Sequence, residues 1–267
     1  MDKQAVREAV WDAFEAGDQA RFPFPPHDRI PNFAGADAAC ERLTETAEWA
    51  DAATLKCNPD APQLPVRRAA LRAGKTVYVA QPRLRDPDPF LRLDPDELAG
   101  PDDEGATDRP TVDDATTVSG ISTHGTPVAP EAVPHVDLVV AGSVAVTTDG
   151  ARIGKGEGYS DLEWGVLREL DAVDDETTVA TTVHELSVVD GPESALVGEE
   201  HEGDATSAPA LPEPDAHDVP LDLIATPERT LRTDTPYERP SRIDWDALDP
   251  ERLDEIPVLA ERAPGRK

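Results

Sequence analysis

Short apolar segments that alternate with helical patterns constrain the fold of this chain more than any other feature. Apolar and β-branched residues predict strands at 53–57, 76–80, 137–148, 178–183 and 221–225. Strands that alternate with helices imply a mainly parallel sheet that is covered on both faces. We therefore expect an α/β fold in three layers, an open, mainly parallel sheet with helices on both sides.

The first helix is the clearest of the predicted helices. Residues 2–16 place Val6, Val10 and Phe14 on one face, which is the spacing of an amphipathic helix. Lys3 and Arg7 lie one turn apart on a neighbouring face. Two more helices are expected at 35–50 and 63–73. The proline-rich segment 21–33 is expected to be extended.

Three stretches fall outside the strand and helix pattern. Residues 94–118 and 190–216 are rich in Asp, Glu, Pro, Gly and Ala, and they are interpreted as acidic solvated loops. Residues 233–267 contain many prolines and only a short helical pattern at 244–254. We predict one α/β domain at 1–232, with the acidic loops as insertions, followed by an irregular tail.

The charge of the chain excludes some partners. The 25 basic and 55 acidic residues give a formal net charge of −30. Binding to nucleic acid or to an anionic membrane needs clustered Lys and Arg, so neither partner is expected. Five lysines, 4% aromatic residues and evenly spread carboxylates are typical of proteins from halophiles that accumulate salt.

Cysteine usage and hydropathy bear on the compartment. Cys40 and Cys57 provide no disulfide framework and lack the spacing of metal ligands. No apolar run approaches the roughly 20 residues that span a bilayer, and the N-terminus has no hydrophobic signal core. We expect a cytoplasmic protein, and a monomer.

Residues 147–170 are the most informative segment for function. Asp149 and Gly150 form a two-residue hairpin signal. Ser160 and Glu163 fit a capping box, with Ser160 as the N-cap of a helix that continues to Leu170. Between the hairpin and the helix, glycines occupy alternate positions at 154, 156 and 158.

A glycine loop that opens a helix is a candidate anion site. Backbone N–H groups, the positive end of the helix and the cations Arg152 and Lys155 would converge there. The spacing is neither that of a Walker A loop nor that of a dinucleotide fingerprint. A tight turn, in which the glycines serve only the backbone, explains the pattern equally well.

The segment RIGKGEGYSD at 152–161 resembles the glycine signature of the 5-formyltetrahydrofolate cyclo-ligase family, also called methenyltetrahydrofolate synthetases. Lys3 and Arg7 on the first helix, and HDVPLDLIATPER at 217–229, resemble the family in the same order. The branch of methenyltetrahydrofolate synthetase domain-containing proteins is most similar, through the segments 21–36, 81–85 and 136–146.

This resemblance implies an ATP- and Mg²⁺-dependent ligase that closes 5-formyltetrahydrofolate, or a related formyl-pterin, to 5,10-methenyltetrahydrofolate. It implies Lys155 and Tyr159 as catalytic residues, and Asp161 and Asp218 as Mg²⁺ ligands. The ATP contacts it implies are Lys3, Arg7, Arg152, Gly154, Lys155, Gly156, Glu157, Gly158, Tyr159 and Ser160. Asn58 and Asp60 are expected to contact the folate-type substrate, because they lie just past the carboxyl end of a predicted strand, where open α/β sheets bind ligands.

Other readings of these residues remain open. Ser160 and Leu162 stand where the better-known enzymes carry Tyr and Arg, which favours a non-catalytic nucleotide- or folate-binding protein on the same scaffold. Asp161 also fits a charge that stabilises a helix N-terminus, and Asn58 and Asp60 fit an ordinary turn. Catalysis by histidine is not indicated, because no partner spacing marks any of His124, His135, His184 and His217.

Overall fold

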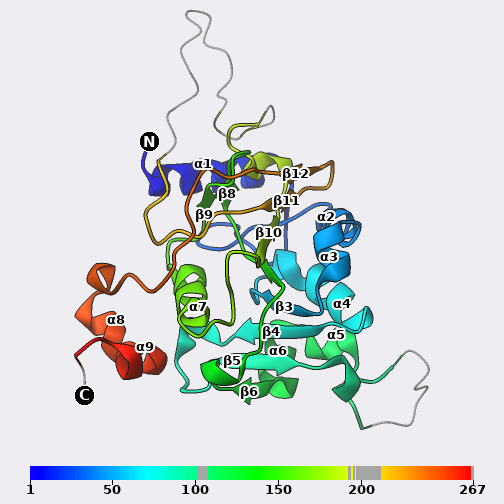
Figure 1. Ribbon diagram of the computed structural model, residues 1–267. Helices are drawn as coiled ribbons and strands as arrows, with labels where there is room; N and C mark the ends of the chain where they lie inside the picture. Colours follow the sequence, from blue (N-terminus) through cyan, green and yellow to red (C-terminus); the bar gives the residue numbers. More distant parts are fainter. Residues whose placement is uncertain (101–107, 192–193, 195, 197–211, 266–267) are drawn as a thin grey trace, which may run out of the picture.

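Eight strands form the central sheet of the computed structural model, which describes residues 1–100, 108–191, 194, 196 and 212–265 (Figure 1). The strands are β3 (Thr54–Cys57), β4 (Thr76–Ala80), β5 (Phe90–Leu93), β6 (Thr126–Val128), β7 (Leu138–Val140), β10 (Thr178–Thr182), β11 (Leu223–Ala225) and β12 (Thr230–Arg232). Their order across the sheet is β12-β11-β10-β7-β3-β4-β5-β6.

The centre of the sheet is parallel and its margins are antiparallel. β11, β10, β7, β3 and β4 run in the same direction, whereas β12 on one side and β5 and β6 on the other are antiparallel to their neighbours. The five parallel strands lie within the five predicted segments. The three antiparallel strands were not predicted from the sequence.

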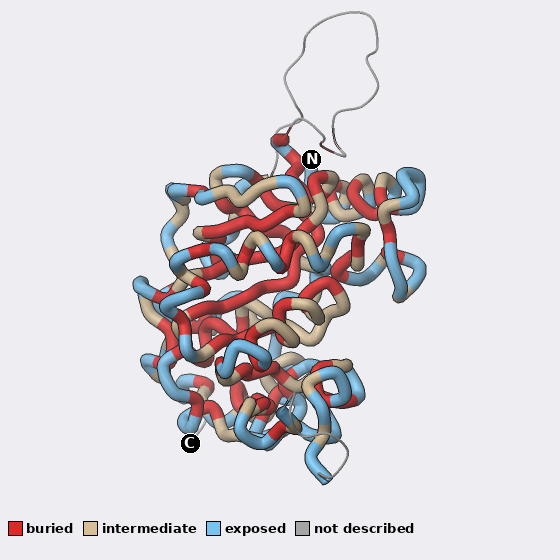
Figure 2. The backbone as a smooth tube through the Cα atoms, turned by 90° about the vertical axis from the view of Figure 1, so that its right-hand side faces the viewer, coloured by how far each residue is buried: buried red, intermediate tan, exposed pale blue. Residues whose placement is uncertain are grey.

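Alternate residues of each strand pack on opposite faces of the sheet. Leu138 and Val140 of β7 belong to one apolar cluster, and Val139 belongs to the other. The first cluster lies under α2 (Ala36–Thr44), α3 (Ala47–Asp51), α4 (Leu64–Arg72), α5 (Val112–Ala115) and α6 (Val118–His124). The second lies under α7 (Tyr159–Arg168), α8 (Pro250–Glu255) and α9 (Pro257–Arg262). The predicted three-layer α/β fold is therefore confirmed, and Figure 2 shows the buried strands at its centre.

A third apolar cluster holds α1 (Lys3–Ala16) against two small hairpins. The α1 helix begins as predicted, because Asp2 accepts a hydrogen bond from the Ala5 N–H at 2.8 Å. Its apolar face is fully buried and includes Val6, Val10 and Phe14. The hairpins are β1 (Ala20–Arg21) with β2 (Asn32–Phe33), and β8 (Ala145–Val146) with β9 (Arg152–Ile153).

Two predicted elements are divided in the structure. The helix expected at 35–50 is interrupted at Thr46, whose hydroxyl accepts from the Trp49 N–H and starts a new helix. The strand expected at 137–148 leaves the central sheet after Val140 and resumes as β8 in a separate hairpin. The chain turns at Gly142, where an added Cβ would meet Asp60 and Ile30 at 3.0 Å.

The first acidic segment contains more helix than expected. Thr111 and Asp114 form a capping box that starts α5, and Thr117 caps α6. Acidic and hydroxyl side chains that suggested a solvated loop therefore cap two short helices. Residues 101–107 of this segment and most of 190–216 lie outside the described residues.

The tail follows α7 along one face of the domain. Its buried side chains pack against the same core as α7, and they include Ile243, Ile256 and Leu259. It also contains two helices, α8 and α9, where the sequence indicated one. The boundary at 232 stays a prediction. In the described part of the chain, no helix is long and apolar enough to cross a membrane.

Short 3₁₀ turns complete the described secondary structure. They are Ala61–Gln63, Pro82–Leu84, Pro95–Glu97, Pro130–Ala132, Glu185–Ser187 and Trp245–Ala247. The first of them matters for the site, because it lies just past the carboxyl end of β3 and has Asp60 as its N-cap.

Candidate active site

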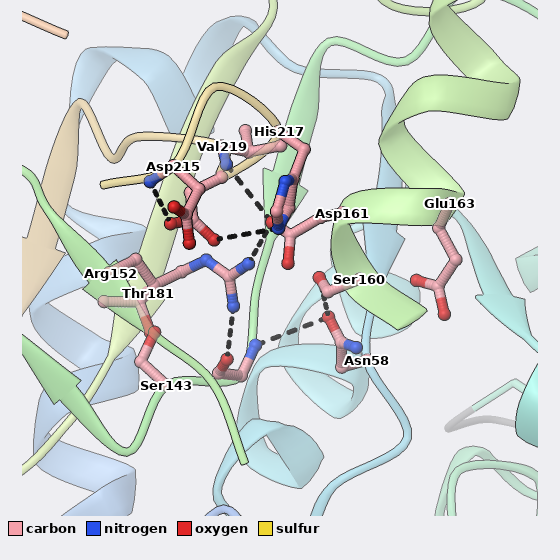
Figure 3. A network of polar contacts seen from close by, with 12 residues as sticks. Asn58, Ser143, Arg152, Ser160, Asp161, Glu163, Thr181, Asp215, His217 and Val219 are labelled. Atoms are coloured by element: carbon pink, nitrogen blue, oxygen red, sulfur yellow. Dashed lines mark hydrogen bonds and ion pairs between the residues drawn. The ribbon is translucent and has the colours of Figure 1, made fainter. Parts of the chain in front are cut away.

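The neighbouring strands β3 and β7 mark a switch point in the sheet. From β3 the chain crosses to β4 on one side, whereas β7, on the other side of β3, leads on to β10. Connections that diverge in this way leave a crevice at the carboxyl ends of the strands, where open α/β sheets bind ligands. Asn58 follows β3 there, and its side-chain oxygen accepts from the Gly142 N–H at 3.3 Å (Figure 3).

The glycine loop, residues 154–158, connects β9 to α7. Gly156 and Gly158 have φ values of +100° and +66°, so both use the conformation that favours glycine. Gly158 is the N-cap of α7 and contributes no side-chain hydrogen bond. Ser160, in the first turn, lies 3.5 Å from the Asn58 oxygen, which brings the start of α7 to the switch point (Figure 3).

The predicted capping box at Ser160 and Glu163 is wrong. The helix begins at Tyr159, two residues earlier than predicted, because Gly158 reaches the left-handed conformation and caps it. Glu163 is buried and forms an ion pair with Lys56 of β3, which is buried as well. Burial raises the pKa of Glu163, and the Lys56 charge opposes this shift. The sequence analysis missed this pair, because Lys56 lies inside a strand pattern.

Arg7 is the side chain of α1 that contacts the glycine loop directly. Its Nε donates to the Gly154 carbonyl at 2.7 Å, and a Cβ at Gly156 would lie 3.2 Å from its guanidinium carbon. Partial burial lowers the pKa of Arg7, against the pull of nearby carboxylates such as Asp218. Helix α1 and the glycine loop, more than 140 residues apart in the sequence, therefore meet at one point.

Lys3 lies one turn before Arg7 and contacts a different segment. Its ammonium forms ion pairs with Asp215 at 2.7 Å and with Asp218. Burial lowers the pKa of Lys3, but hydrogen bonds to the two carboxylates outweigh burial and raise it overall. Lys3 thus connects α1 to residues 215–218, which precede β11.

Arg152, just before the glycine loop, connects the loop to the switch point. The side chain is buried and donates to the Gly142 carbonyl at 3.1 Å and to the Asp161 carboxylate (Figure 3). The same Asp161 oxygen accepts from the Val219 N–H at 3.1 Å. Asp161 therefore lies between Arg152 and the segment that carries Asp218.

Lys155 is the exposed cation of the glycine loop. It forms an ion pair with Glu157 at 2.7 Å, and both side chains are more than a third exposed. Exposed pairs of this kind contribute about 1 kcal/mol or less. Lys155 is also close enough to Asp60 for its charge to oppose the rise that burial causes in the pKa of that carboxyl. The loop and the predicted substrate contacts are therefore neighbours.

One group of side chains has the composition of a metal site. Asp215, His217 and Asp218 offer ligand atoms that all lie within 4.8 Å of one another. Carboxylates are the hard oxygen ligands that Mg²⁺ prefers, so the donor set fits the implied ion. Of the two predicted ligands, Asp218 belongs to this group. Asp161 borders it through Val219, and its second oxygen accepts no hydrogen bond from the described residues.

The predicted substrate contacts lie at the carboxyl end of β3. The Asn58 oxygen also lies 3.3 Å from the Lys56 ammonium, and Arg67 donates to the carbonyls of Asn58 and Asp60 at 2.6 and 3.0 Å. Gln63, which the sequence analysis missed, is buried beside Asp60, and its side-chain oxygen has no hydrogen-bond donor among the described residues. A buried acceptor without a donor is costly, so the Gln63 oxygen is a candidate contact for a donor group of a ligand.

Comparison with known proteins agrees with the signature at 152–161. The pattern of the 5-formyltetrahydrofolate cyclo-ligase family matches residues 3–193. The methenyltetrahydrofolate synthase domain-containing protein of Bos taurus is 38% identical over 259 residues, which cover 97% of this chain and 61% of that protein. The proteins of the same name from Mus musculus and Homo sapiens are 40% and 36% identical over 259 residues, which cover 97% of this chain and 62% and 61% of those proteins.

The chain thus spans about three fifths of the length of these curated relatives. A solved structure, the NMR structure of 5,10-methenyltetrahydrofolate synthetase from Aquifex aeolicus, is 16% identical with a TM-score of 0.47, and the alignment covers 89% of this chain and 96% of that one. The family pattern and the sequence identities to the curated relatives show that the chain belongs to the 5-formyltetrahydrofolate cyclo-ligase family.

Proposed function

We propose that the protein is an ATP- and Mg²⁺-dependent ligase that closes 5-formyltetrahydrofolate, or a related formyl-pterin, to 5,10-methenyltetrahydrofolate with release of ADP and phosphate. The observation that carries the proposal is the contact of Arg7 with Gly154 and Gly156 at the start of α7. A cation from α1 there joins backbone N–H groups and a positive helix end, which together favour a phosphate chain.

The other cations near the loop differ in how directly they can contact a triphosphate. Lys155 can exchange Glu157 for a phosphate oxygen at small cost, because their ion pair is exposed. We assign Lys155 the neutralisation of charge on the phosphoryl group in transfer. Arg152 is buried and bound to Asp161, so it supports the loop from beneath. Lys3 holds the segment of Asp218 against α1.

The proposed Mg²⁺ ligands are Asp218, its neighbour Asp215, and the second oxygen of Asp161. When bound, Mg²⁺ neutralises phosphate oxygens and leaves the phosphoryl group easier to transfer. Lys3, which contacts both Asp215 and Asp218, holds these carboxylates in place before any ion arrives.

The substrate is proposed to bind across the switch point. Asp60 and the unpaired oxygen of Gln63 offer acceptors for the N–H groups of a pterin ring that lies beside Asn58. The formyl oxygen takes the γ-phosphoryl group of ATP, the N10 amine attacks the activated carbon, and phosphate departs with that oxygen as N10 loses its proton. Tyr159 is proposed to orient the formyl group from the first residue of α7.

The test is a turnover assay in concentrated KCl with ATP, Mg²⁺ and 5-formyltetrahydrofolate, in which the methenyl product is followed by its absorbance. Asp161→Asn is expected to lower the rate about 100-fold, since it weakens both Arg152 and the metal site. Asp175→Asn removes an exposed carboxylate, bound to Arg168, and is expected to leave the rate unchanged. Product formation that does not need ATP would contradict the proposal.

A second candidate is a non-catalytic nucleotide- or folate-binding protein on this scaffold. Ion pairs favour it, because Arg152 and Lys3 already neutralise the carboxylates of Asp161 and Asp218. ATP binding without any methenyl product, at saturating Mg²⁺ and folate, would select this candidate over the ligase.

A further inference from the structure

The C-terminal tail reaches the glycine loop from the side opposite α1. After β12 it follows α7, where Trp164 donates its indole N–H to the Pro240 carbonyl at 2.9 Å. Gly165 allows close contact, because a Cβ there would meet Ile243 at 2.9 Å. Beyond α8, the fully buried side chains of Ile256 and Leu259 anchor the tail in the core. The position of α8 is therefore fixed by packing on both sides of it.

Arg252 of α8 contacts the end of the glycine loop. Its guanidinium lies over the ring of Tyr159, 4.9 Å from the ring centroid. It donates to the Glu157 carbonyl, and a Cβ at Gly158 would lie 3.7 Å from two of its nitrogens. Three consecutive residues at the start of α7 thus meet one cation from the tail.

Arg252 forms no ion pair with a carboxylate in the part of the chain that the structure describes. Within the described residues no carboxylate lies within ion-pair distance of it, whereas two other arginines of the tail have one, Arg239 with Asp222 and Arg262 with Glu131. Arg7, on the other side of the loop, also forms no ion pair with a described carboxylate, and it likewise donates to a loop carbonyl. In a chain with a net charge of −30, two guanidinium groups on one glycine loop that form no ion pair with a described carboxylate favour an anion between them.

We propose that Arg252 is a phosphate-binding residue of the ATP site, supplied by the tail. This inference rests on the proposed function of the loop. A guanidinium has five N–H donors, and one of them suffices for the Glu157 carbonyl, so the others remain for phosphate oxygens. Arg7 and Arg252 then hold the phosphate chain from opposite ends of the loop, and the Arg252 contact with Tyr159 orients that ring.

The test compares nucleotide binding by the full-length wild type, Arg252→Ala, Arg252→Lys and Arg262→Ala, by titration calorimetry with ATP and with AMP in concentrated KCl. Arg252→Ala is expected to weaken ATP binding about tenfold and AMP binding less, because one charge-assisted hydrogen bond to phosphate is lost. Arg252→Lys should restore part of the affinity. Arg262→Ala removes a tail ion pair away from the loop and should bind ATP like the wild type.

Three other results would contradict the role proposed for Arg252. If Arg252→Ala binds ATP as tightly as Arg262→Ala does, Arg252 only fastens the tail and the inference is wrong. An equal loss for ATP and AMP, together with a lower unfolding temperature, would also assign Arg252 a structural role. Wild-type protein that binds no ATP would overturn the proposed function and this inference together, whereas the first two results leave the proposed function intact.

Discussion

Arg7 illustrates how single residues are held in this site. Its guanidinium donates to Gly154 in the loop and to Gln4 on its own helix, at 2.7 and 3.0 Å. Burial lowers its pKa, yet an arginine starts from so high a value that it keeps its charge at any physiological pH. The site therefore holds a permanent cation that does not depend on pH, and its binding of anions should respond to salt more than to proton concentration.

The two cysteines give a prediction at the same scale. Burial raises the pKa of Cys40 from 9.0 to about 12 and that of Cys57 to about 11. Since the thiolate is the reactive form, neither thiol should react with a disulfide reagent at pH 8 in the native protein, and both should react after unfolding. Rapid modification of either thiol in the native state would contradict the buried positions.

The same two thiols set a direction for stability against pH. Between about pH 9 and 11 the native state keeps protons on Cys40 and Cys57 that the unfolded state has lost. The native state then binds more protons than the unfolded state, so these groups make the free energy of unfolding fall as the pH rises through this window. Below pH 8 they contribute no pH dependence.

At the scale of elements, the ion pair of Lys56 and Glu163 fastens α7 to β3. Both side chains are at least 95% buried, so removal of one partner leaves a buried charge. Lys56→Met is expected to lower the free energy of unfolding by about 3–5 kcal/mol. Glu163→Gln together with Lys56→Met should cost less than Lys56→Met alone, because no charge is left unpaired. Denaturant unfolding of Lys56→Met, Glu163→Gln and the double variant measures this, and a double variant as unstable as the sum of the two single variants would contradict the pairing.

Helices and strands that are defined by their own apolar periodicity could be predicted from the sequence, whereas those that depend on neighbouring segments could not. The 14 residues of α1 and the buried parallel strands could be predicted, since apolar periodicity alone defines them. The antiparallel strands β5, β6 and β12 are three or four residues long and depend on their neighbours for hydrogen bonds. The start of α7 was misplaced because the capping pattern does not show that Gly158 takes the cap position, or that Glu163 pairs with a buried lysine of β3.

The residues of the candidate site also divide into those that a local sequence pattern marks and those that only the fold brings in. The glycine loop and the cations of α1 could be proposed from the sequence, because they form a contiguous motif and a helical spacing. Asp215, Gln63 and Arg252 could not, since nothing local marks them and only the path of the chain brings them to the site. The tail in particular carried no functional pattern in its sequence.

For the whole molecule, the net charge of −30 is the dominant property. Self-repulsion among 55 carboxylates opposes a compact state unless salt screens it. If the charge is an adaptation to high internal salt, the unfolding temperature should rise by more than about 10 °C between dilute buffer and concentrated KCl. Thermal unfolding followed by circular dichroism checks this, and a fold indifferent to salt would count against the halophile interpretation.

The proposed function requires that the glycine loop and Arg7 hold the phosphates of ATP. Titration calorimetry of the wild type, Arg7→Ala and Arg72→Ala with ATP and Mg²⁺ tests it most directly. Arg72 is exposed and paired with Asp113, so its loss changes the net charge equally without touching the loop. Arg7→Ala is expected to weaken ATP binding at least tenfold, because a charge-assisted hydrogen bond to phosphate is lost, and Arg72→Ala is expected to bind ATP like the wild type. Equal ATP affinity in all three proteins would contradict this requirement.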